Sequence, residues 1–544
     1  MRKNIYFLFA ALFGLAAVSC SSPEKMAEMA ENVTIKCEPA VLEVVGGNID
    51  AKVSVTYPED YFHPKAILEV APVIVYEGGE VVGESLMFQG EKVKDNFEVV
   101  PSEGASITRK VRFQYVPGME KCYLELRGTV SHKAKFADLP TRKVADGANT
   151  TYMLVCQKGK VDLKADRYQE IIKETAEGQI LYQINSANVR NNQLTSKSIK
   201  EFQAALDEIK ANERKTLKGT DIIAYASPDG KESDNAKLSS KRSASAEKAF
   251  DKVTKKHPVD GPVNVTSIAE DWEGFQELVA ASDIEDKELI IRVLSMYSDP
   301  AVREMEIKNM SSIFKTLAKE VLPELRRARF IANVEFQNYT NDELLQLIEE
   351  NIDVLDETAL LRAATLVKEN DQKIELYKKA ADKFSSNAAQ YNLAVVYLNM
   401  DDSGKAKRAL DKCEKDADWN NAMGAIALRE GDYAQAARYF AAAGNDTAKE
   451  NLAVIDVLNG KYSDAAAKLA GKSGYNAALV ALLNGNNAPA AALKCECPQA
   501  AYLRAVAAAR QGNASAVASN LADAKACEKL AARAAKDIEF AQYR

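Results

Sequence analysis

The pattern of apolar and polar residues divides the chain into three regions with different periodicities. From about residue 33 to 158, short segments alternate apolar and polar side chains, which is the period-two pattern of half-buried strands. Turn signals such as Gly46-Gly47 and Pro117-Gly118 separate these segments. Many short strands with frequent turns predict a β-sandwich over residues 33–160. The clearest predicted strands are Val33–Cys37, Ala51–Thr56, Val73–Tyr76, Lys110–Tyr115 and Cys122–Leu126.

Strand and helix patterns alternate in the middle of the chain, over residues 161–340. Apolar side chains at Ile199, Phe202, Leu206 and Ile209 recur at helical spacing and predict one buried helix face. A second helix is expected from about 237 to 253, and residues 271–324 have a largely helical pattern. Such alternation predicts an α/β layer with a helical insertion before its last strand. The predicted strands are Ile180–Ile184, Asp221–Ala226, Val263–Ile268 and Arg329–Phe336.

Residues 341–544 are helical and rich in alanine, and they contain a repeated turn. Gly431, Gly460, Gly485 and Gly512 lie 29, 25 and 27 residues apart, each after an apolar helix and before an alanine-rich one. Glycine permits a left-handed turn, and alanine lets paired helices approach closely. The region resembles tetratricopeptide repeats, whose unit is about 34 residues. The shorter spacing predicts trimmed helices and an irregular array.

The first residues carry a processing signal. Arg2-Lys3 precede an apolar run that ends in the small residues Ala17-Val18-Ser19 and then Cys20. The segment resembles a bacterial lipoprotein signal, although an ordinary signal peptide with a chance cysteine is the alternative. The resemblance implies that residues 1–19 are removed and that Cys20 carries diacylglycerol and an N-acyl chain, which together bind a membrane firmly. Residues 20–32 are polar and are expected to be a tether.

Net charge, apolar runs and cysteine count restrict the classes of function that the chain can have. The 544 residues carry a net charge of −7, which argues against a general nucleic-acid binder. No second apolar run reaches the roughly 18 to 20 residues that a membrane span needs, so lipid would be the membrane attachment. Seven cysteines remain beyond Cys20, an odd number, so they cannot all pair within the chain. Cys495-x-Cys497 could be half of a metal site, but small apolar residues in a helical array are the favoured interpretation.

The sharpest motif lies in the middle region. The strand ending Ala224-Tyr225-Ala226 is followed by Ser227-Pro228-Asp229-Gly230 and then by Asn-x-x-Leu-Ser-x-x-Arg from Asn235 to Arg242. This resembles the OmpA-like domain, which binds peptidoglycan. The resemblance implies that a carboxylate and a guanidinium clamp diaminopimelate. An arginine fork suits a carboxylate because it can bind both oxygens, and Arg242 matches the family's arginine.

The family's aspartate position, however, holds Ser227, which cannot neutralise an ammonium group. Asp229 could substitute if the turn re-aims it. The expected peptidoglycan-binding residues are therefore Ser227, Asp229, Asn235 and Arg242. The alternative is a structural Arg242 on a scaffold that no longer binds cell wall.

Signals for catalysis are weak. Glu270, Asp271 and Glu273 surround Trp272, and acids near a helix start are the favoured interpretation because they complement the helix dipole. The histidines are scattered, and neither a nucleophile elbow nor a phosphate-binding loop occurs. We therefore expect no enzyme activity, no metal and no cofactor.

Together these patterns predict a multidomain chain: an N-terminal β-sandwich of immunoglobulin-like architecture, a central OmpA-like α/β domain with a helical insertion, and a C-terminal α-helical repeat array. We expect a lipid-anchored scaffold at the outer membrane, on the periplasmic rather than the cell-surface side. Its expected partners are envelope proteins, with an integral outer-membrane protein foremost, and no nucleic acid. The alternative function is a peptidoglycan-binding tether.

Overall fold

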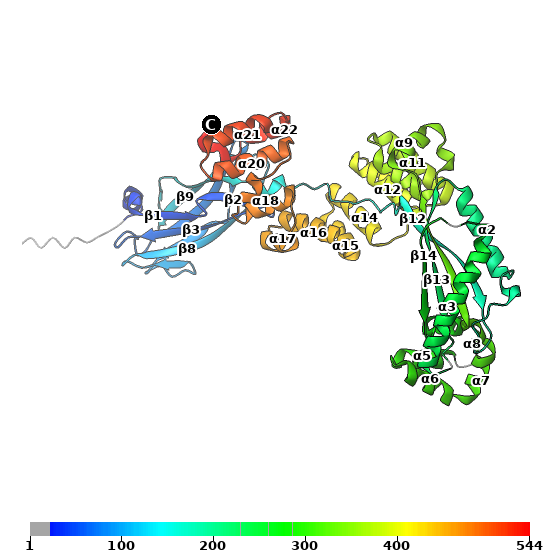
Figure 1. Ribbon diagram of the computed structural model, residues 1–544. Coiled ribbons are helices and arrows are strands. Elements are labelled where there is room, and N and C mark those ends of the chain that lie inside the picture. Colours follow the sequence, from blue (N-terminus) through cyan, green and yellow to red (C-terminus); the bar gives the residue numbers. More distant parts are fainter. Residues whose placement is uncertain (1–21, 229, 259, 285–286) are drawn as a thin grey trace, which may run out of the picture. The chain divides into compact units, whose positions relative to one another are not determined.

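The computed structural model describes residues 22–228, 230–258, 260–284 and 287–544 (Figure 1). The chain forms two compact units. The first combines the described residues up to Lys164 with Gln390–Arg544, and the second is Ala165–Ala389. The second unit is thus inserted into the first. The domain boundary expected at 340/341 does not coincide with a boundary between these units, because the first helices of the predicted array belong to the inserted unit.

The N-terminal region is rich in β-strands, as the alternating pattern predicts. Strand β3 pairs with β1, β2 and β8, and a second set of strands pairs around β4 and β9. Strand β2 pairs antiparallel with β3 and parallel with β11, so it links the two sets. The strands are β1 Thr34–Glu38, β2 Val41–Val45, β3 Asn48–Tyr57, β4 Ile67–Tyr76, β5 Gly79–Val82, β6 Leu86–Gly90, β7 Glu98–Val100, β8 Ala105–Gln114, β9 Cys122–His132, β10 Lys135–Asp138 and β11 Arg142–Asn149.

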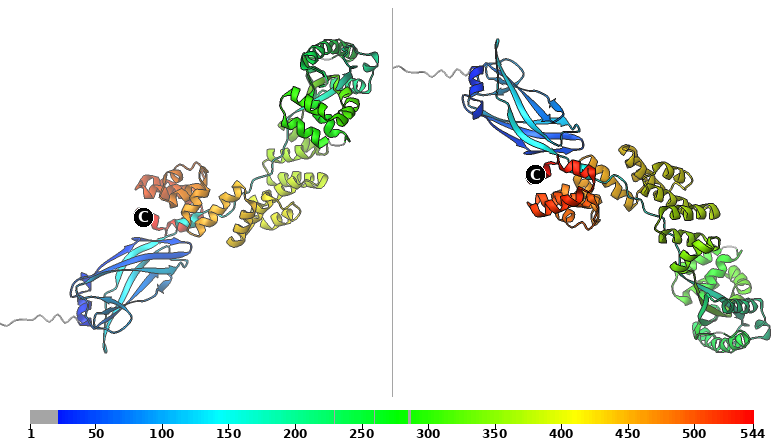
Figure 2. Two further views of the ribbon diagram at one scale, coloured as in Figure 1. Left: turned by 90° about the horizontal axis from the view of Figure 1, so that it is seen from below. Right: turned by 90° about the horizontal axis from the view of Figure 1, so that it is seen from above.

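Residues 22–32, which belong to the segment expected to be a tether, form short helices that contact the first unit. Helix α1 (Pro23–Glu28) begins at Ser22, whose Oγ accepts a hydrogen bond from the Lys25 N–H at 3.3 Å. Met26 is fully buried in the core, and its Sδ accepts a hydrogen bond from the His63 N–H at 3.4 Å. The segment looked polar, but Met26 and Ala30 are four residues apart and both are buried. Figure 2 shows α1 (dark blue) at one end of the sandwich.

The inserted unit begins with a four-stranded sheet in the order β12-β15-β13-β14, in which only β13 and β14 are parallel. Helix α2 buries the four apolar residues of its predicted face against this sheet, together with Phe250 of α3 and Phe330 of β15. Short helices α4 to α8 lie between β14 and β15. The elements are β12 Ile171–Leu181, α2 Lys197–Ala211, β13 Lys215–Tyr225, α3 Glu232–Thr254, β14 Val263–Ile268, α4 Trp272–Ala281, α5 Lys287–Met296, α6 Pro300–Asn309, α7 Ser311–Glu320, α8 Leu322–Leu325 and β15 Arg327–Gln337.

Strand β12 begins earlier than the sequence predicts. It pairs with β15 along its whole length, from Ile171 opposite Gln337 to Leu181 opposite Arg327. The first half of β12 is largely exposed because β12 is an edge strand. An exposed edge needs no apolar run, so the pattern revealed only the buried end near Ile180.

The rest of the chain is a run of helices, as predicted. Gly431, Gly460, Gly485 and Gly512 all have positive φ, between +73° and +85°, as expected for turns between helices. The helices are α9 Asn341–Glu350, α10 Glu357–Leu366, α11 Asn370–Phe384, α12 Asn387–Asn399, α13 Ser403–Leu410, α14 Ala417–Arg429, α15 Tyr433–Ala443, α16 Asp446–Leu458, α17 Tyr462–Lys468, α18 Tyr475–Leu483, α19 Ala488–Ala491, α20 Pro498–Arg510, α21 Ala514–Ala524 and α22 Glu528–Ala534.

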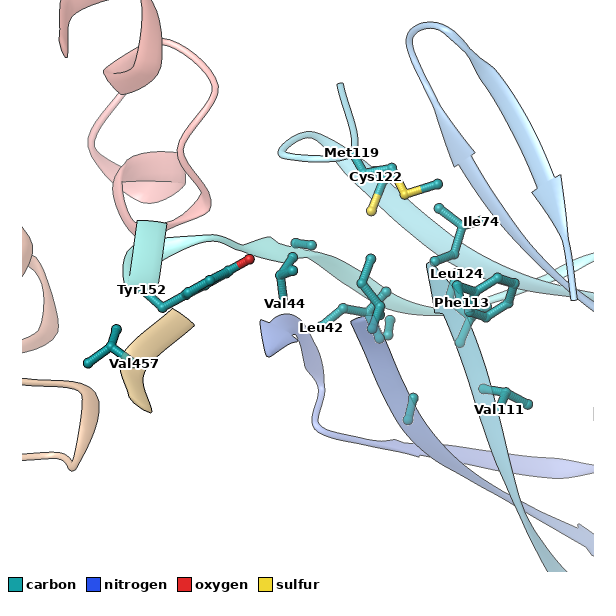
Figure 3. Packing of buried hydrophobic residues seen from close by; sticks show 14 of the residues in the cluster. Leu42, Val44, Ile74, Val111, Phe113, Met119, Cys122, Leu124, Tyr152 and Val457 are labelled. Carbon is teal, nitrogen blue, oxygen red and sulfur yellow. The ribbon is translucent and has the colours of Figure 1, made fainter. Parts of the chain in front are cut away.

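The β-rich region and the C-terminal helices share one hydrophobic core in the first unit. Figure 3 shows Tyr152, which follows the last strand of the sandwich, close to Val457 of α16 and Val44 of β2. At the same junction a Cβ on Gly46 would lie 3.2 Å from the Asn459 carbonyl oxygen. Such close packing between residues some 300 to 400 positions apart places the two parts in one compact unit.

Candidate functional site

The most distinctive site of the first unit is a groove of the helical array that holds a segment of the same chain. Residues Val155–Lys164, here called the strap, follow the short 3-10 helix η2 (Thr151–Leu154) and have no regular secondary structure. The strap runs along helices α18, α16, α14 and α12 (Figure 1). Each of these helices contributes one asparagine to it: Asn476, Asn451, Asn421 and Asn392.

Three of these asparagines each bind both backbone groups of one strap residue. Asn476 Oδ1 accepts from the Cys156 N–H at 2.8 Å, and its Nδ2 donates to the Cys156 carbonyl at 3.0 Å. Asn451 binds Lys160 in the same way, at 2.7 and 2.8 Å. A side-chain amide that pairs with both groups reads the backbone rather than the side chain.

The pattern continues to the end of the strap. Asn392 accepts from the Lys164 N–H at 2.8 Å and donates to its carbonyl at 3.0 Å. Asn421 donates to the Lys160 carbonyl at 3.0 Å and accepts from Asn451 Nδ2 at 2.9 Å. Three of the four amides, those of Asn392, Asn421 and Asn451, are only 1–2% exposed. A buried amide is costly unless it is hydrogen-bonded, so these residues need the strap in place.

Charges on the array match the lysines of the strap. Lys158 Nζ lies 2.8 Å from Asp401 Oδ2, and Lys160 Nζ lies 3.3 Å from Glu450 Oε2. Lys164 contacts Asp416, and its Nζ also lies 5.2 Å from the centre of the Tyr391 ring. Burial acts to lower the pKa of Lys164, but its hydrogen bond to Asp416 and the acidic charges outweigh this, so the pKa is raised. The strap lysine therefore stays charged in the groove.

Gly159 lets the strap approach the array closely. Its φ is +68°, and a Cβ at this position would lie 2.7 Å from the Cβ of Ala425 in α14. The neighbouring carbonyl, that of Lys158, accepts from Arg429 Nε at 2.6 Å. Both the backbone angle and the contact exclude any larger residue. The sequence contained a signal that could have revealed the groove, since each of the four asparagines precedes a helix-ending turn by nine or ten residues.

Arg242, the predicted clamp arginine, lies in α3 and donates hydrogen bonds to backbone carbonyls. It is 1% exposed. Its Nε donates to the Ser186 carbonyl at 3.0 Å, Nη1 to Tyr225 at 2.8 Å and Nη2 to Gln183 at 3.2 Å. Three backbone carbonyls thus hold the buried guanidinium in place, a geometry that is compatible with a structural arginine and with a clamp arginine alike.

Ser227 and Asn235 are brought together at the end of β13. Asn235 Nδ2 lies 3.2 Å from the Ser227 carbonyl, 3.1 Å from the Gly230 carbonyl and 3.1 Å from Glu270 Oε1. Ser227 Oγ accepts from Arg326 Nε at 3.3 Å. Asn235 thus holds the turn through its amide. Asp229 and Cys20 lie outside the described residues.

The acidic segment after β14 starts a helix, as favoured from the sequence. Asp271 Oδ1 accepts from the Gly274 N–H at 2.9 Å at the start of α4. The same carboxylate forms a buried ion pair with Arg327, whose Nη2 lies 2.8 Å from Oδ2. Burial raises the pKa of Glu270, which also accepts from Trp272 Nε1 at 2.9 Å. The ion pair connects the segment before α4 to β15, and the contacts of these acidic residues are those of a structural cluster.

The described residues hold no group of three or more side chains placed to bind a metal ion. Over the same residues, no helix has the length and apolar character to span a membrane. No protein-family model matches the sequence, and no curated protein matches it either.

Proposed function

We propose that this chain is a non-catalytic, lipid-anchored scaffold of the bacterial outer membrane that binds protein partners of the envelope. The proposal rests on the strap, because the helical array binds this segment, which joins the N-terminal β-rich region to the inserted unit. The grip uses backbone hydrogen bonds and ion pairs, and therefore serves connection rather than chemistry.

Finer fold assignments are part of the same proposal. An immunoglobulin-like sandwich is supported by β2, which pairs antiparallel with β3 and parallel with β11 and so passes between the two sheets. An OmpA-like inserted unit is supported by the motif from Asn235 to Arg242, which lies in α3 directly after β13. Tetratricopeptide-like repeats are supported by the helix pairs joined at glycine turns with positive φ.

Lipid on Cys20 would hold the sandwich close to the membrane. Only Ser21 separates Cys20 from Ser22, where α1 begins against the sandwich. Two Cα-to-Cα steps span at most about 7.6 Å. The C-terminal helices pack at the other end of the sandwich (Figure 2). Helix α1 and the C-terminal helices thus lie at opposite ends of the β-rich region.

Affinity purification of the native protein from membranes tests the scaffold. We expect envelope proteins in stoichiometric amounts, an integral outer-membrane protein among them. Recovery of the chain alone would contradict the proposal. A Cys20→Ala variant with an intact signal should move to the soluble fraction if lipid is the anchor, and should stay on membranes if partners also hold it.

The alternative is a peptidoglycan tether through the inserted unit. The contact of Asn235 with Ser227 keeps the family's turn assembled and supports this alternative. The full chain should then sediment with purified peptidoglycan, and Ser227→Asp, which restores the family's carboxylate, should increase retention. Absence of retention for both proteins would refute the tether while leaving the scaffold untouched.

A further inference from the structure

Two thiols, Cys495 and Cys497, lie side by side in the loop between α19 and α20. The backbone N–H of Cys497 donates to the Sγ of Cys495 at 3.3 Å, so the first sulfur turns back toward the second cysteine. Cys497 also directly precedes α20, a helix of 13 residues whose N-terminus carries partial positive charge. The loop therefore places two thiols next to each other at the start of a helix.

Arg504 of α20 fixes this loop. Its Nη1 donates to the Leu493 carbonyl at 3.1 Å and to the Cys495 carbonyl at 2.8 Å. Its Nε donates to Asn520 Oδ1 at 2.8 Å, which orients the guanidinium. The arginine therefore fixes the backbone at Leu493 and Cys495, directly before the second thiol.

The two thiols differ in character. Hydrogen bonds from the Cys497 side chain and N–H, together with the charge of Arg504, lower the pKa of the exposed Cys495. Burial raises the pKa of Cys497. The thiolate is the nucleophile in thiol–disulfide exchange. Cys495, with its lowered pKa, is therefore suited to attack a disulfide first, and Cys497 is suited to attack the resulting mixed disulfide. Burial also raises the pKa of three further thiols, those of Cys37, Cys122 and Cys413.

Both thiols open onto a cavity of about 1170 Å³. Its wall is largely apolar and includes Leu469, Tyr475 and Leu493, and the strap contributes Cys156. A cavity of this size admits a small molecule or a short stretch of polypeptide.

We propose that Cys495 and Cys497 form a dithiol site that reduces disulfides entering this cavity. The Cys495 thiolate attacks one sulfur of R–S–S–R, a mixed disulfide forms, and RS⁻ leaves. The Cys497 thiol then loses its proton and attacks the Cys495 sulfur, which closes the Cys495–Cys497 disulfide and releases the second RS⁻. Two electrons pass from the two thiols to the disulfide, and the two protons end on two RSH molecules. The proposal does not depend on lipid attachment or on a protein partner.

The test uses the full chain in its reduced form at pH 7, followed by alkylation and mass spectrometry of its peptides. Two probes distinguish the source of the disulfide: oxidised glutathione, and a peptide closed into a ring by one disulfide. Wild-type protein should lose two alkylatable thiols and yield the peptide that contains a Cys495–Cys497 disulfide. Cys497→Ser should stop at the first step and carry one adduct on Cys495. Reaction with oxidised glutathione alone would identify a site for small disulfides. Reaction with both probes would identify a site that also accepts polypeptide disulfides.

Matched measurements keep the result interpretable. Cys413→Ser should behave as wild type, because Cys413 is half-buried and its pKa is raised to about 11. In every protein, Cys495 should react at least about tenfold faster than Cys413 in the same molecule, a comparison that needs no variant. Equal rates at the two positions, an adduct on Cys156 or Cys527 in place of Cys495, or a Cys495–Cys156 product would overturn the proposal.

Discussion

The asparagines in the groove should control whether the strap stays seated, and Asn451→Ala is the most direct perturbation. Asn451 is 2% exposed and makes three hydrogen bonds, two to the backbone of Lys160 and one to Asn421. Each contributes about 0.5–1.5 kcal/mol net. Water can reach part of the freed strap backbone, because the Lys160 side chain is exposed. We therefore expect strap opening to become about 2 kcal/mol easier, which is roughly a thirtyfold rise in the open population.

Trypsin reports this opening because the strap carries three of its cleavage sites, Lys158, Lys160 and Lys164. When opening and closing are fast, the cleavage rate follows the open population, so cutting in the strap should accelerate about thirtyfold. Asn520→Ala is the matched control, since Asn520 is a half-buried asparagine of the array that bonds Arg504 and not the strap. Equal strap cleavage in the two variants, at equal global stability in urea, would refute the reasoning.

Three further predictions follow from particular contacts. Gly159→Val should dislodge the strap and speed hydrogen exchange of the strap amides. Gly471→Val is the control, because Gly471 has a similar φ but no atom within 4 Å of its Cβ position, and it should leave this exchange unchanged. Equal exchange in the two variants would show that contact with Ala425 does not limit the side chain at position 159. Replacement of residues 166–388 by a short glycine-serine linker should leave a folded first unit by circular dichroism, because Asn392 bonds the last strap residue; an unfolded product would contradict this. Met26→Ala should cost about 2–4 kcal/mol in urea unfolding, since the side chain is fully buried, and an unchanged midpoint would mean that α1 is not part of the core.

The folded start of the chain shows why composition alone misled the prediction for residues 20–32. The segment is polar on average, yet Met26 and Ala30 fall on one side and are buried. A six-residue helix has too few residues for its periodicity to stand out. Its position depends on the packing of Met26 in the core next to His63, a partner 37 residues away that the local sequence does not reveal.

The candidate site was only partly predictable. The motif from Asn235 to Arg242 identified residues that do come together near the end of β13. Its chemistry was not predictable, because the acceptors of the arginine are carbonyls from a distant segment around Ser186. The strap was missed entirely, since an extended segment without periodicity reads as a linker.

Sequence by itself determined the local elements: the alternating strands, the apolar face of α2 and the glycine turns of the array. These depend on neighbours within a few residues, so their pattern survives in the linear chain. Tertiary structure decided which elements share a core and what fills the groove. Lys160 meets Asn451 across 291 residues. This pairing forms only in the folded chain, where the strap lies against the helical array. Burial of the Asn451 amide is favourable there because the strap backbone supplies its hydrogen-bond partners.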